Sequence, residues 1–292
     1  MRKKVTKAVF PVAGMGTRFL PATKSVPKEI MTLVDRPLVQ YAIDEARAAG
    51  IKEFIFVTSR GKGALEDYFD HAPQLEQELR KKGKTELLET LQSTNMDSGA
   101  IAYIRQHKAL GLGHAVWCAR RLIGNEPFAV MLPDDVIAAE KPCLKQMVEA
   151  YEEVGGNLIS VLEVPHDEVS SYGVIAPGAQ LSETLTEVTG LVEKPPVDEA
   201  PSNKIISGRY ILQPEVMGVL KDQGKGAGGE IQLTDAMAKM IGNQPFHAAT
   251  FAGRRFDCGS KTGFVEATLA LALEREDMGV EVRAMAQRLL AE

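Results

Sequence analysis

Residues 7–28 have the sequence KAVFPVAGMGTRFLPATKSVPK, and this stretch decides the fold. Lys7–Val12 is an apolar run with the composition of a buried strand, and it leads directly into Gly14 and Gly16. Glycine lets a backbone approach a ligand closely, and ligands of open α/β sheets lie where strands end. The stretch therefore predicts an α/β fold whose backbone meets a phosphate or a base at Ala13, Gly14, Gly16 and Thr17.

The same turn does not match the dinucleotide-binding loop Gly-x-Gly-x-x-Gly. The position of the third glycine is Phe19, and Pro21 hinders a helix from starting there. Three cations follow instead, on a segment stiffened by proline: Arg18, Lys24 and Lys28. Cations with this spacing can bind different oxygens of a polyphosphate. For this segment on its own, an ordinary basic surface loop is the alternative.

Composition disfavours several classes of protein. The 292 residues include 34 Lys and Arg against 39 Asp and Glu, and the net charge of −5 argues against a nucleic-acid partner. The longest charge-free stretches, 169–182 and 240–253, are shorter than the roughly 18 apolar residues of a membrane span. Arg2–Lys4 and the apolar run after it imitate a signal peptide, but Pro11 interrupts that run. We therefore expect no membrane association.

The three cysteines are far apart and include no Cys-x-x-Cys pair: Cys118, Cys143 and Cys258. An odd number at such spacing indicates reduced thiols rather than a disulfide framework. The sequence therefore predicts a cytoplasmic protein.

Short runs rich in Val, Ile and Phe alternate with helical patterns, as in an α/β protein with a mixed central sheet. The expected strands are Lys7–Val12, Glu53–Ser59, Ala100–Gln106, Phe128–Leu132, Asn157–Glu163, Gly173–Ala176, Leu185–Glu193 and Ile205–Leu212. The expected helices are Pro37–Ala49, Pro73–Leu91, Lys141–Val154, Glu230–Ile241, Lys261–Glu274 and Val280–Leu290. The pattern predicts one α/β domain with a β-rich insertion and a helical tail. Apolar stripes in the tail have the spacing of core positions: Phe264, Leu269, Leu273, Val282, Met285 and Leu289.

Carboxylates follow one of the expected strands. Asp134 and Asp135 come at the end of Phe128–Leu132, where side chains reach the ligand crevice and oxygen ligands can hold Mg²⁺. Asp257 could supply another carboxylate. On the sequence alone, a turn or a helix cap is the more common use of such a pair.

Seven blocks of the chain together resemble the signature of the sugar-phosphate nucleotidyltransferases, most closely the bacterial members that use UTP and glucose 1-phosphate. In the family's order they are residues 11–29, Gly111–Ala115, Leu132–Asp135, Val192–Pro195, Ser207–Tyr210, Gly229–Asp235 and Asp257–Gly259. The resemblance implies a single domain, 1–292, with a Rossmann-like nucleotidyltransferase fold. Residues 1–165 would form its nucleotide-binding half, 166–260 its sugar-phosphate-binding half and 261–292 its C-terminal helices.

The resemblance also implies an activity. An oxygen of glucose 1-phosphate would attack the α-phosphorus of UTP in line, with Mg²⁺ as cofactor, giving UDP-glucose and pyrophosphate. Because that oxygen is already anionic, no general base is needed. Arg18 would hold the departing pyrophosphate, Lys28 the α-phosphate and Lys194 the sugar phosphate. Asp134 and Asp257 would be metal ligands, since two uncompensated carboxylates would repel a triphosphate.

Further contacts are implied by resemblance. Those to the nucleotide are Ala13, Gly14, Gly16, Thr17, Glu29, Gln106 and Gly111. The amide of Gln106 offers a donor and an acceptor and could read the pairing edge of uracil, whereas His114, at the next helix start, is expected to be structural. Those to the sugar phosphate are Gly173, Glu193, Lys194 and Gly208. A surface salt bridge is the alternative for Glu193 and Lys194.

Several alternatives stay open at this point. The nucleotide could be dTTP or CTP, or the sugar another hexose 1-phosphate. The chain could also be a non-catalytic regulator that binds nucleotide sugars. The resemblance further implies a homo-oligomer, a dimer or a tetramer, with the helical tail in the contact.

Overall fold

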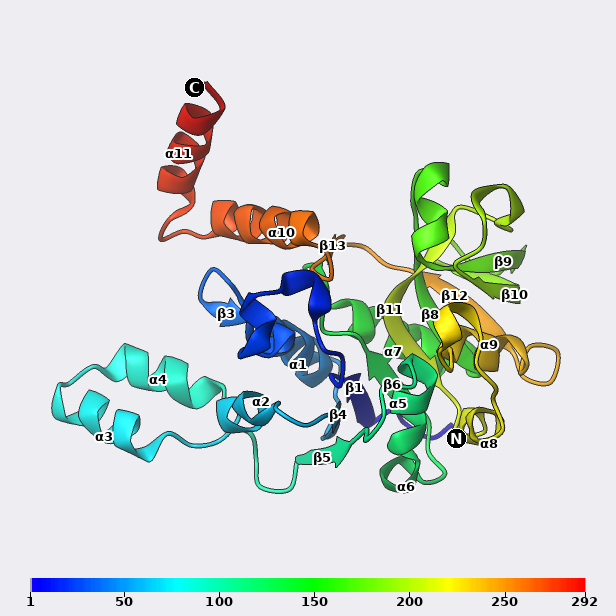
Figure 1. Ribbon diagram of the computed structural model, residues 1–292, viewed down its shortest axis with the longest axis horizontal. Coiled ribbons are helices and arrows are strands. Elements are labelled where there is room, and N and C mark those ends of the chain that lie inside the picture. Colours follow the sequence, from blue (N-terminus) through cyan, green and yellow to red (C-terminus); the bar gives the residue numbers. More distant parts are fainter. Residues whose placement is uncertain (1, 292) are drawn as a thin grey trace.

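The computed structural model describes residues 2–291. A mixed sheet of nine strands forms the centre of the molecule, in the order β5-β4-β1-β6-β11-β8-β12-β10-β9 (Figure 1). Four neighbouring strands are parallel: β1 (Lys7–Pro11), β4 (Glu53–Thr58), β5 (Ile101–Arg105) and β6 (Phe128–Met131). The other five mix both directions: β8 (Asn157–Glu163), β9 (Gly173–Gln180), β10 (Leu185–Glu193), β11 (Lys204–Leu212) and β12 (Phe246–Thr250). The expected α/β fold with a mixed sheet is confirmed.

Helices cover both faces of this sheet, and β1 shows why. Val9 packs into one apolar cluster while its neighbours Ala8 and Phe10 pack into another, because successive side chains of a strand point to opposite faces. The first face is covered by α5 (Leu112–Cys118), α8 (Val216–Lys221) and α9 (Leu233–Ala238). The second is covered by α1 (Leu38–Ala48) and α7 (Cys143–Val154). Strands buried on both sides therefore have apolar runs rather than alternating patterns.

Two small antiparallel pairs stand beside the central sheet. One joins β2 (Thr32–Leu33) to β3 (Arg36–Pro37), and the other joins β7 (Asp135–Ala138) to β13 (Arg254–Asp257). The second pair matters for function because it begins and ends at aspartates.

The sequence prediction of one long helix over Pro73–Leu91 is wrong. The structure has α3 (Pro73–Lys81) and α4 (Thr85–Ser93), and Gly83 between them has a φ of 62°. A left-handed glycine ends a helix at low cost, so the chain turns back there. Together with the preceding α2 (Gly63–Tyr68), these helices form an arm that projects from the sheet (Figure 1).

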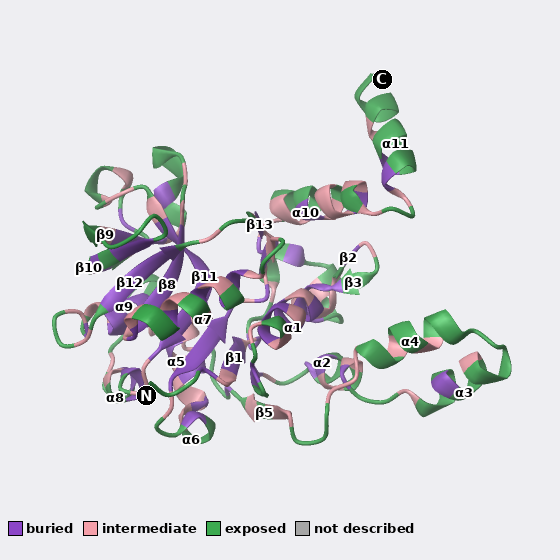
Figure 2. Cartoon of the chain, turned by 180° about the vertical axis from the view of Figure 1, so that it is seen from behind, coloured by how far each residue is buried: buried purple, intermediate pink, exposed green. Residues whose placement is uncertain are grey.

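The C-terminal helices α10 (Lys261–Glu274) and α11 (Gly279–Ala291) also project from the body of the molecule (Figure 1). The expectation that their apolar stripes are core is wrong for Leu269, Met285 and Leu289, which are 40%, 43% and 60% exposed. Figure 2 shows α11 largely green, the colour of exposed residues. Within residues 2–291, no helix is both long and apolar enough to cross a membrane.

Candidate active site

The glycine turn after β1 is a tightly held loop. Gly16 has a φ of 65°, and its carbonyl accepts a hydrogen bond of 2.8 Å from the hydroxyl of Thr23. A Cβ at position 16 would lie 3.0 Å from Thr23, so glycine suits both the backbone angle and the packing. Short helical turns follow at Thr17–Phe19, Ala22–Lys24 and Lys28–Ile30. Gly14, Thr17 and Arg18 are exposed on this loop, whereas Ala13 is buried.

The pairing of β7 with β13 brings the predicted carboxylates together. Asp257 lies opposite Asp135 in the register, and the backbone N–H of Cys258 donates to the carbonyl of Asp134 at 2.8 Å. A Cβ built on Gly259 would lie 3.1 Å from Oδ2 of Asp134 and 3.0 Å from Oδ1 of Asp257. Asp134 and Asp257 therefore flank one small space, and Nη1 of Arg18 donates to the carbonyl of Gly259 beside it at 3.3 Å.

The sequence alone suggests two uncompensated carboxylates, but Asp134 has a lysine beside it and Asp257 has a neutral hydrogen-bond donor. Nζ of Lys28 lies 2.6 Å from Oδ2 of Asp134, and the hydroxyl of Tyr172 donates to Oδ2 of Asp257 at 3.3 Å. Burial lowers the pKa of Lys28, but the charge and hydrogen bond of Asp134, together with the charges of Glu29 and Asp135, outweigh it and the net pKa is raised. Both charges of the Lys28–Asp134 pair are thus present at neutral pH in the protein without ligand.

Asp135 has a different environment from Asp134. Nε of Arg255 donates to its Oδ1 at 2.6 Å, and the guanidinium of Arg255 lies over the ring of Tyr172. Burial, with the nearby charge of Asp134, raises the pKa of Asp135 to about 6 against the pull of Arg255. Asp135 is therefore bound within the protein, while Asp134 faces the crevice.

A buried arginine anchors the loop that carries these aspartates. Arg209 on β11 donates to the backbone carbonyls of Leu132 and Asp135 at 2.9 and 2.7 Å. Its Nε and Nη2 also donate to both carboxylate oxygens of Glu45 on α1, at 2.8–3.1 Å. The short turn between β6 and β7 is therefore tied to two separate elements of the core.

A pocket of about 210 Å³ opens beside the glycine turn, and its lining includes Gly14, Gln106, Gly111 and Glu230. Gln106 is 8% exposed, and its Nε2 lies 3.1 Å from the carbonyl of Gly111 and 2.9 Å from Nδ1 of His114. Gly111 has a φ of 104°, and a Cβ there would lie 2.8 Å from the carbonyl oxygen of Ile231. Glycine is therefore required where the loop meets the chain before α9.

The residues expected at a sugar phosphate gather at the ends of β9 and β10. Glu193 is paired with Gly173 across the two strands, and the hydroxyl of Thr234 donates to its Oε2 at 2.7 Å. Nζ of Lys194 lies 4.0 Å from Oε1 of Glu193, and half of the lysine side chain is exposed. The backbone N–H of Lys194 donates to the carbonyl of Tyr172 at 3.0 Å. Tyr172 therefore links the group of residues around Glu193 to Asp257.

Two further predicted site residues have partners within the protein. Oε2 of Glu29 accepts a 2.6 Å bond from Nζ of Lys62, and both side chains are buried. Gly208, with a φ of 71°, leaves the space that the carboxylate of Asp135 fills. Glu29 is therefore bonded to Lys62 beside the site residue Lys28, and Gly208 packs against Asp135.

Sequence reasoning did not assign roles to Tyr172, Arg255 or Lys62. Arg255 precedes Asp257 by two positions on a strand, which puts both side chains on one face, and this is a usable signal. Lys62 follows β4, at the edge of the sheet where the other ligand loops lie. Their partners Asp135 and Glu29 are distant in sequence, so only the fold identifies those contacts.

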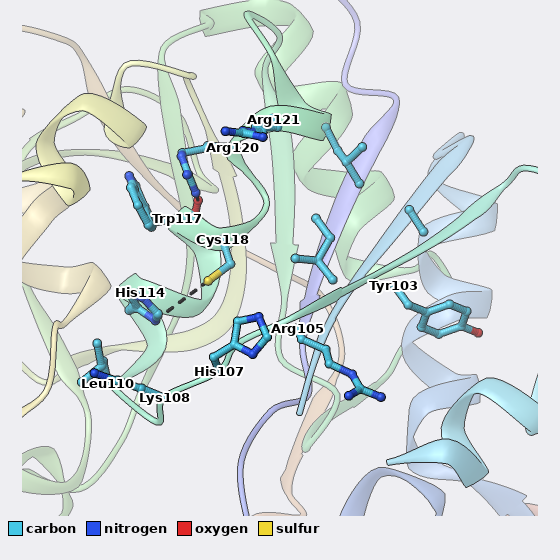
Figure 3. Close-up of a pocket in the computed structure, with 13 residues that line it drawn as sticks. Tyr103, Arg105, His107, Lys108, Leu110, His114, Trp117, Cys118, Arg120 and Arg121 are labelled. Atoms are coloured by element: carbon cyan, nitrogen blue, oxygen red, sulfur yellow. Dashed lines mark hydrogen bonds between the residues drawn. The ribbon is translucent and has the colours of Figure 1, made fainter. Parts of the chain in front are cut away.

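A larger cavity of about 700 Å³ lies between β5 and the helices α5 and α6 (Arg120–Ile123). Figure 3 shows His114 and Trp117 on one wall and His107 near Arg105 on another. His114 thus belongs to the wall of this cavity while its Nδ1 meets Gln106 of the smaller pocket.

A glycine turn after the first strand, paired carboxylates and flanking cations are the features of an enzyme that handles nucleotide phosphates. The sequence model of the Nucleotidyl transferase family matches residues 7–274, and the chain belongs to this family.

Proteins of known name resemble the chain over nearly its whole length. A UTP–glucose-1-phosphate uridylyltransferase of Komagataeibacter xylinus is 54% identical over 261 residues, which are 89% of this chain and 92% of that protein. The enzyme of the same name from Bacillus subtilis (strain 168) is 49% identical and covers 94% of each chain. The UTP-bound UGPase of Acinetobacter baumannii superposes with a TM-score of 0.90 at 40% identity, over 98% of this chain and 99% of that one.

Proposed function

We propose that the protein transfers a uridylyl group from UTP to α-D-glucose 1-phosphate, giving UDP-glucose and pyrophosphate. The observation that carries this proposal is the 54% identity over 89% of the chain to a UTP–glucose-1-phosphate uridylyltransferase. The geometry supports it, because Tyr172 joins Asp257 to Lys194 beside Glu193, and Lys28 joins Asp134 to the glycine turn that also lines the pocket of Gln106. A nucleotide in the pocket and a sugar phosphate beside Glu193 would both have phosphates near the aspartates.

Charge neutralisation and positioning account for the chemistry. An oxygen of glucose 1-phosphate attacks the α-phosphorus in line and the pyrophosphate oxygen leaves, so no proton has to be removed from the nucleophile. Lys28 stabilises the charge on the α-phosphate, Arg18 binds the departing pyrophosphate and Lys194 orients the attacking phosphate. Glu193, held by Thr234, accepts hydrogen bonds from sugar hydroxyls. The backbone of Gly173 contacts the sugar, and glycine is suited to this position because a Cβ would lie 3.1 Å from Oε2 of Glu193.

The site has donors suited to Mg²⁺, which binds through one or two carboxylates together with substrate phosphates. Asp134 and Asp257 would hold the ion, and it would neutralise charge on the reacting phosphates. Their oxygens flank the small space at Gly259, which fits a shared ligand. Within residues 2–291, no group of three or more His, Cys, Asp or Glu side chains has the arrangement of a metal site, so the phosphates would complete the coordination. Nζ of Lys28, which lies on Asp134, would bind the α-phosphate in place of that contact.

Pyrophosphate release is the direct test. The purified protein is incubated with Mg²⁺, glucose 1-phosphate and UTP, and in parallel with dTTP, CTP and other hexose 1-phosphates. We expect turnover to be fastest with UTP and glucose 1-phosphate. If turnover occurs only with another pair, that pair replaces UTP and glucose 1-phosphate as the proposed substrates. If no pair is turned over although UDP-glucose binds, the non-catalytic regulator is favoured.

We also propose a homo-oligomer, a dimer or a tetramer, in which the C-terminal helices make the contact. Six large apolar side chains are exposed on these helices: Val265, Leu269, Val280, Met285, Leu289 and Leu290. A projecting surface of this kind is typical of a protein interface. Sedimentation at micromolar concentration should give an oligomer that Leu289→Asp dissociates, and a monomeric parent protein would contradict the proposal.

The proposed location is the cytoplasm. All three cysteines are free thiols, and Cys143 and Cys258 are buried. Reduced cysteines that pack as small apolar side chains fit a reducing compartment.

A further inference from the structure

The side-chain amide of Gln106 has a fixed orientation. One terminal atom of the amide lies 3.1 Å from the carbonyl oxygen of Gly111, which can only accept a hydrogen bond. That atom is therefore the nitrogen, Nε2. The carbonyl of Gly111 is itself held in place, because the neighbouring Leu110 and Gly113 both bond to the backbone of Ile231, at 2.7 and 2.8 Å.

The second hydrogen of the same amide goes to His114. Nε2 of Gln106 lies 2.9 Å from Nδ1 of the imidazole, so Nδ1 accepts and the ring proton is on its other nitrogen. Burial, and then the charge of Arg120, lower the pKa of His114, which keeps the ring neutral and able to accept. Both amide hydrogens of Gln106 are thus bound within the protein.

The oxygen of the amide is left for the ligand. Within residues 2–291, no side chain or backbone N–H is hydrogen-bonded to Oε1 of Gln106, which belongs to a residue lining the 210 Å³ pocket. An amide free to rotate would present either a donor or an acceptor to a base. With Nε2 fully bound, Gln106 offers only an acceptor.

We propose that His114 is a positioning residue for recognition of the nucleobase: it fixes the Gln106 amide so that Oε1 accepts the N3–H of uracil and opposes the N3 lone pair of cytosine. This inference rests on the proposed function and names its specificity device. It changes the expectation that His114 is only structural. The ring does this from the wall of the larger cavity, where it stands beside Cys118 and Trp117 (Figure 3).

The experiment compares kcat and KM for UTP and CTP in two variants of one position. His114→Leu removes the acceptor, and we expect the KM for UTP to rise about tenfold, with kcat and the KM for glucose 1-phosphate little changed. The ratio of kcat/KM for UTP over CTP should fall by about tenfold or more, since the amide then keeps only its bond to the Gly111 carbonyl and can turn more easily. His114→Asn returns an acceptor close to the position of Nδ1 and should keep the ratio within about twofold of the parent. His107→Leu, at the other histidine of the cavity, is the matched control and should change neither value.

A merely structural role predicts another pattern. If His114→Leu lowers kcat equally for both nucleotides and leaves the UTP over CTP ratio unchanged, the inference is wrong. If that variant does not fold, ¹⁵N NMR of the histidine ring in the parent protein decides, because a proton found on Nδ1 excludes the acceptor role. No turnover of UTP by the parent protein would instead overturn the proposed function, so the two failures are distinct.

Discussion

Two ion pairs of this protein show how the same charges serve different purposes. Arg209 and Glu45 form one pair in the core, with side chains 1% and 7% exposed and three hydrogen bonds between them. Lys28 and Asp134 form the other at the crevice, with side chains 18% and 32% exposed and a single contact.

The difference lies in what satisfies each charge. The guanidinium of Arg209 also binds backbone carbonyls, and Oε1 of Glu45 accepts from the backbone N–H of Leu144, so neither partner can leave without an unpaired buried charge. Lys28 and Asp134 can each be hydrated or take a ligand. The core pair therefore stabilises the position of the site, and the crevice pair is available for exchange with substrate.

The largest effect is expected from breaking the core pair. Arg209→Met leaves the buried charge of Glu45 without a counter-charge, with the backbone N–H of Leu144 as its remaining partner, and frees the turn before Asp135. We expect the free energy of unfolding to fall by about 3–5 kcal/mol, measured by urea denaturation. The double variant Arg209→Met with Glu45→Leu should recover much of that loss, and a single variant as stable as the parent would show that the pair is not needed.

A second prediction concerns the carboxylates of the crevice. Asp134→Asn and Asp257→Asn should each lower turnover at least about a hundredfold, or roughly 2.7 kcal/mol of transition-state stabilisation. Because these side chains are not fully buried, the free energy of unfolding should change by less than about 1 kcal/mol. The exposed Asp222→Asn serves as control. Near-parent activity of either variant at limiting Mg²⁺ would assign that aspartate to a turn or a cap.

Lys194 offers a smaller test of the sugar side. Lys194→Ala removes one charge-assisted contact to a phosphate, worth on the order of 1.5–3 kcal/mol. The KM for glucose 1-phosphate should rise at least about tenfold while the binding of UTP, measured by calorimetry, stays nearly constant. The exposed Lys221→Ala is the control. Equally weakened binding of both substrates would show that Lys194 does not belong to the sugar-phosphate site alone.

The smallest expected effect is the pH dependence of the stability that the crevice pair, Lys28 and Asp134, contributes. Burial raises the pKa of Asp134. The charge and hydrogen bond of Lys28 together lower it by more, so the net pKa lies below the ordinary 3.8. A carboxyl with a depressed pKa stabilises the fold above its unfolded pKa and loses that contribution as the pH falls through its folded pKa. The stability difference between the metal-free parent and Asp134→Asn, at most about 1 kcal/mol, should therefore begin to shrink near pH 3.8 and be lost as the pH falls through the lower pKa of the folded protein. A difference that persists there would mean that packing, not charge, separates the variants.

The parts of the fold that local sequence specifies were predicted well. Asn157–Glu163, Leu185–Glu193 and Lys261–Glu274 begin and end where the sequence placed them, because apolar runs and turn residues mark their ends. The segment 73–91 was predicted wrongly as one helix, since its charged pattern is helical on both sides of Gly83. A single glycine does not reveal that the chain reverses direction there.

The site was predicted in its residue types rather than in its contacts. The glycine turn, the aspartates at a strand end and the cations that follow were visible because each has a local chemical reason. Tyr172, Arg255 and Lys62 were missed as functional residues because each is defined by a partner far away in the chain.

The sequence by itself determined the α/β class, the positions of most strands along the chain and which loops carry phosphate-binding chemistry, because hydrophobic periodicity and glycine placement act over a few residues. Only the tertiary structure decided which charges are bound within the protein and which face the crevice. Lys28 and Glu29 are adjacent in sequence, yet Lys28 lies on Asp134 while Glu29 is buried against Lys62. That choice depends on desolvation and on partners brought together by the sheet, and neither is a local property of the chain.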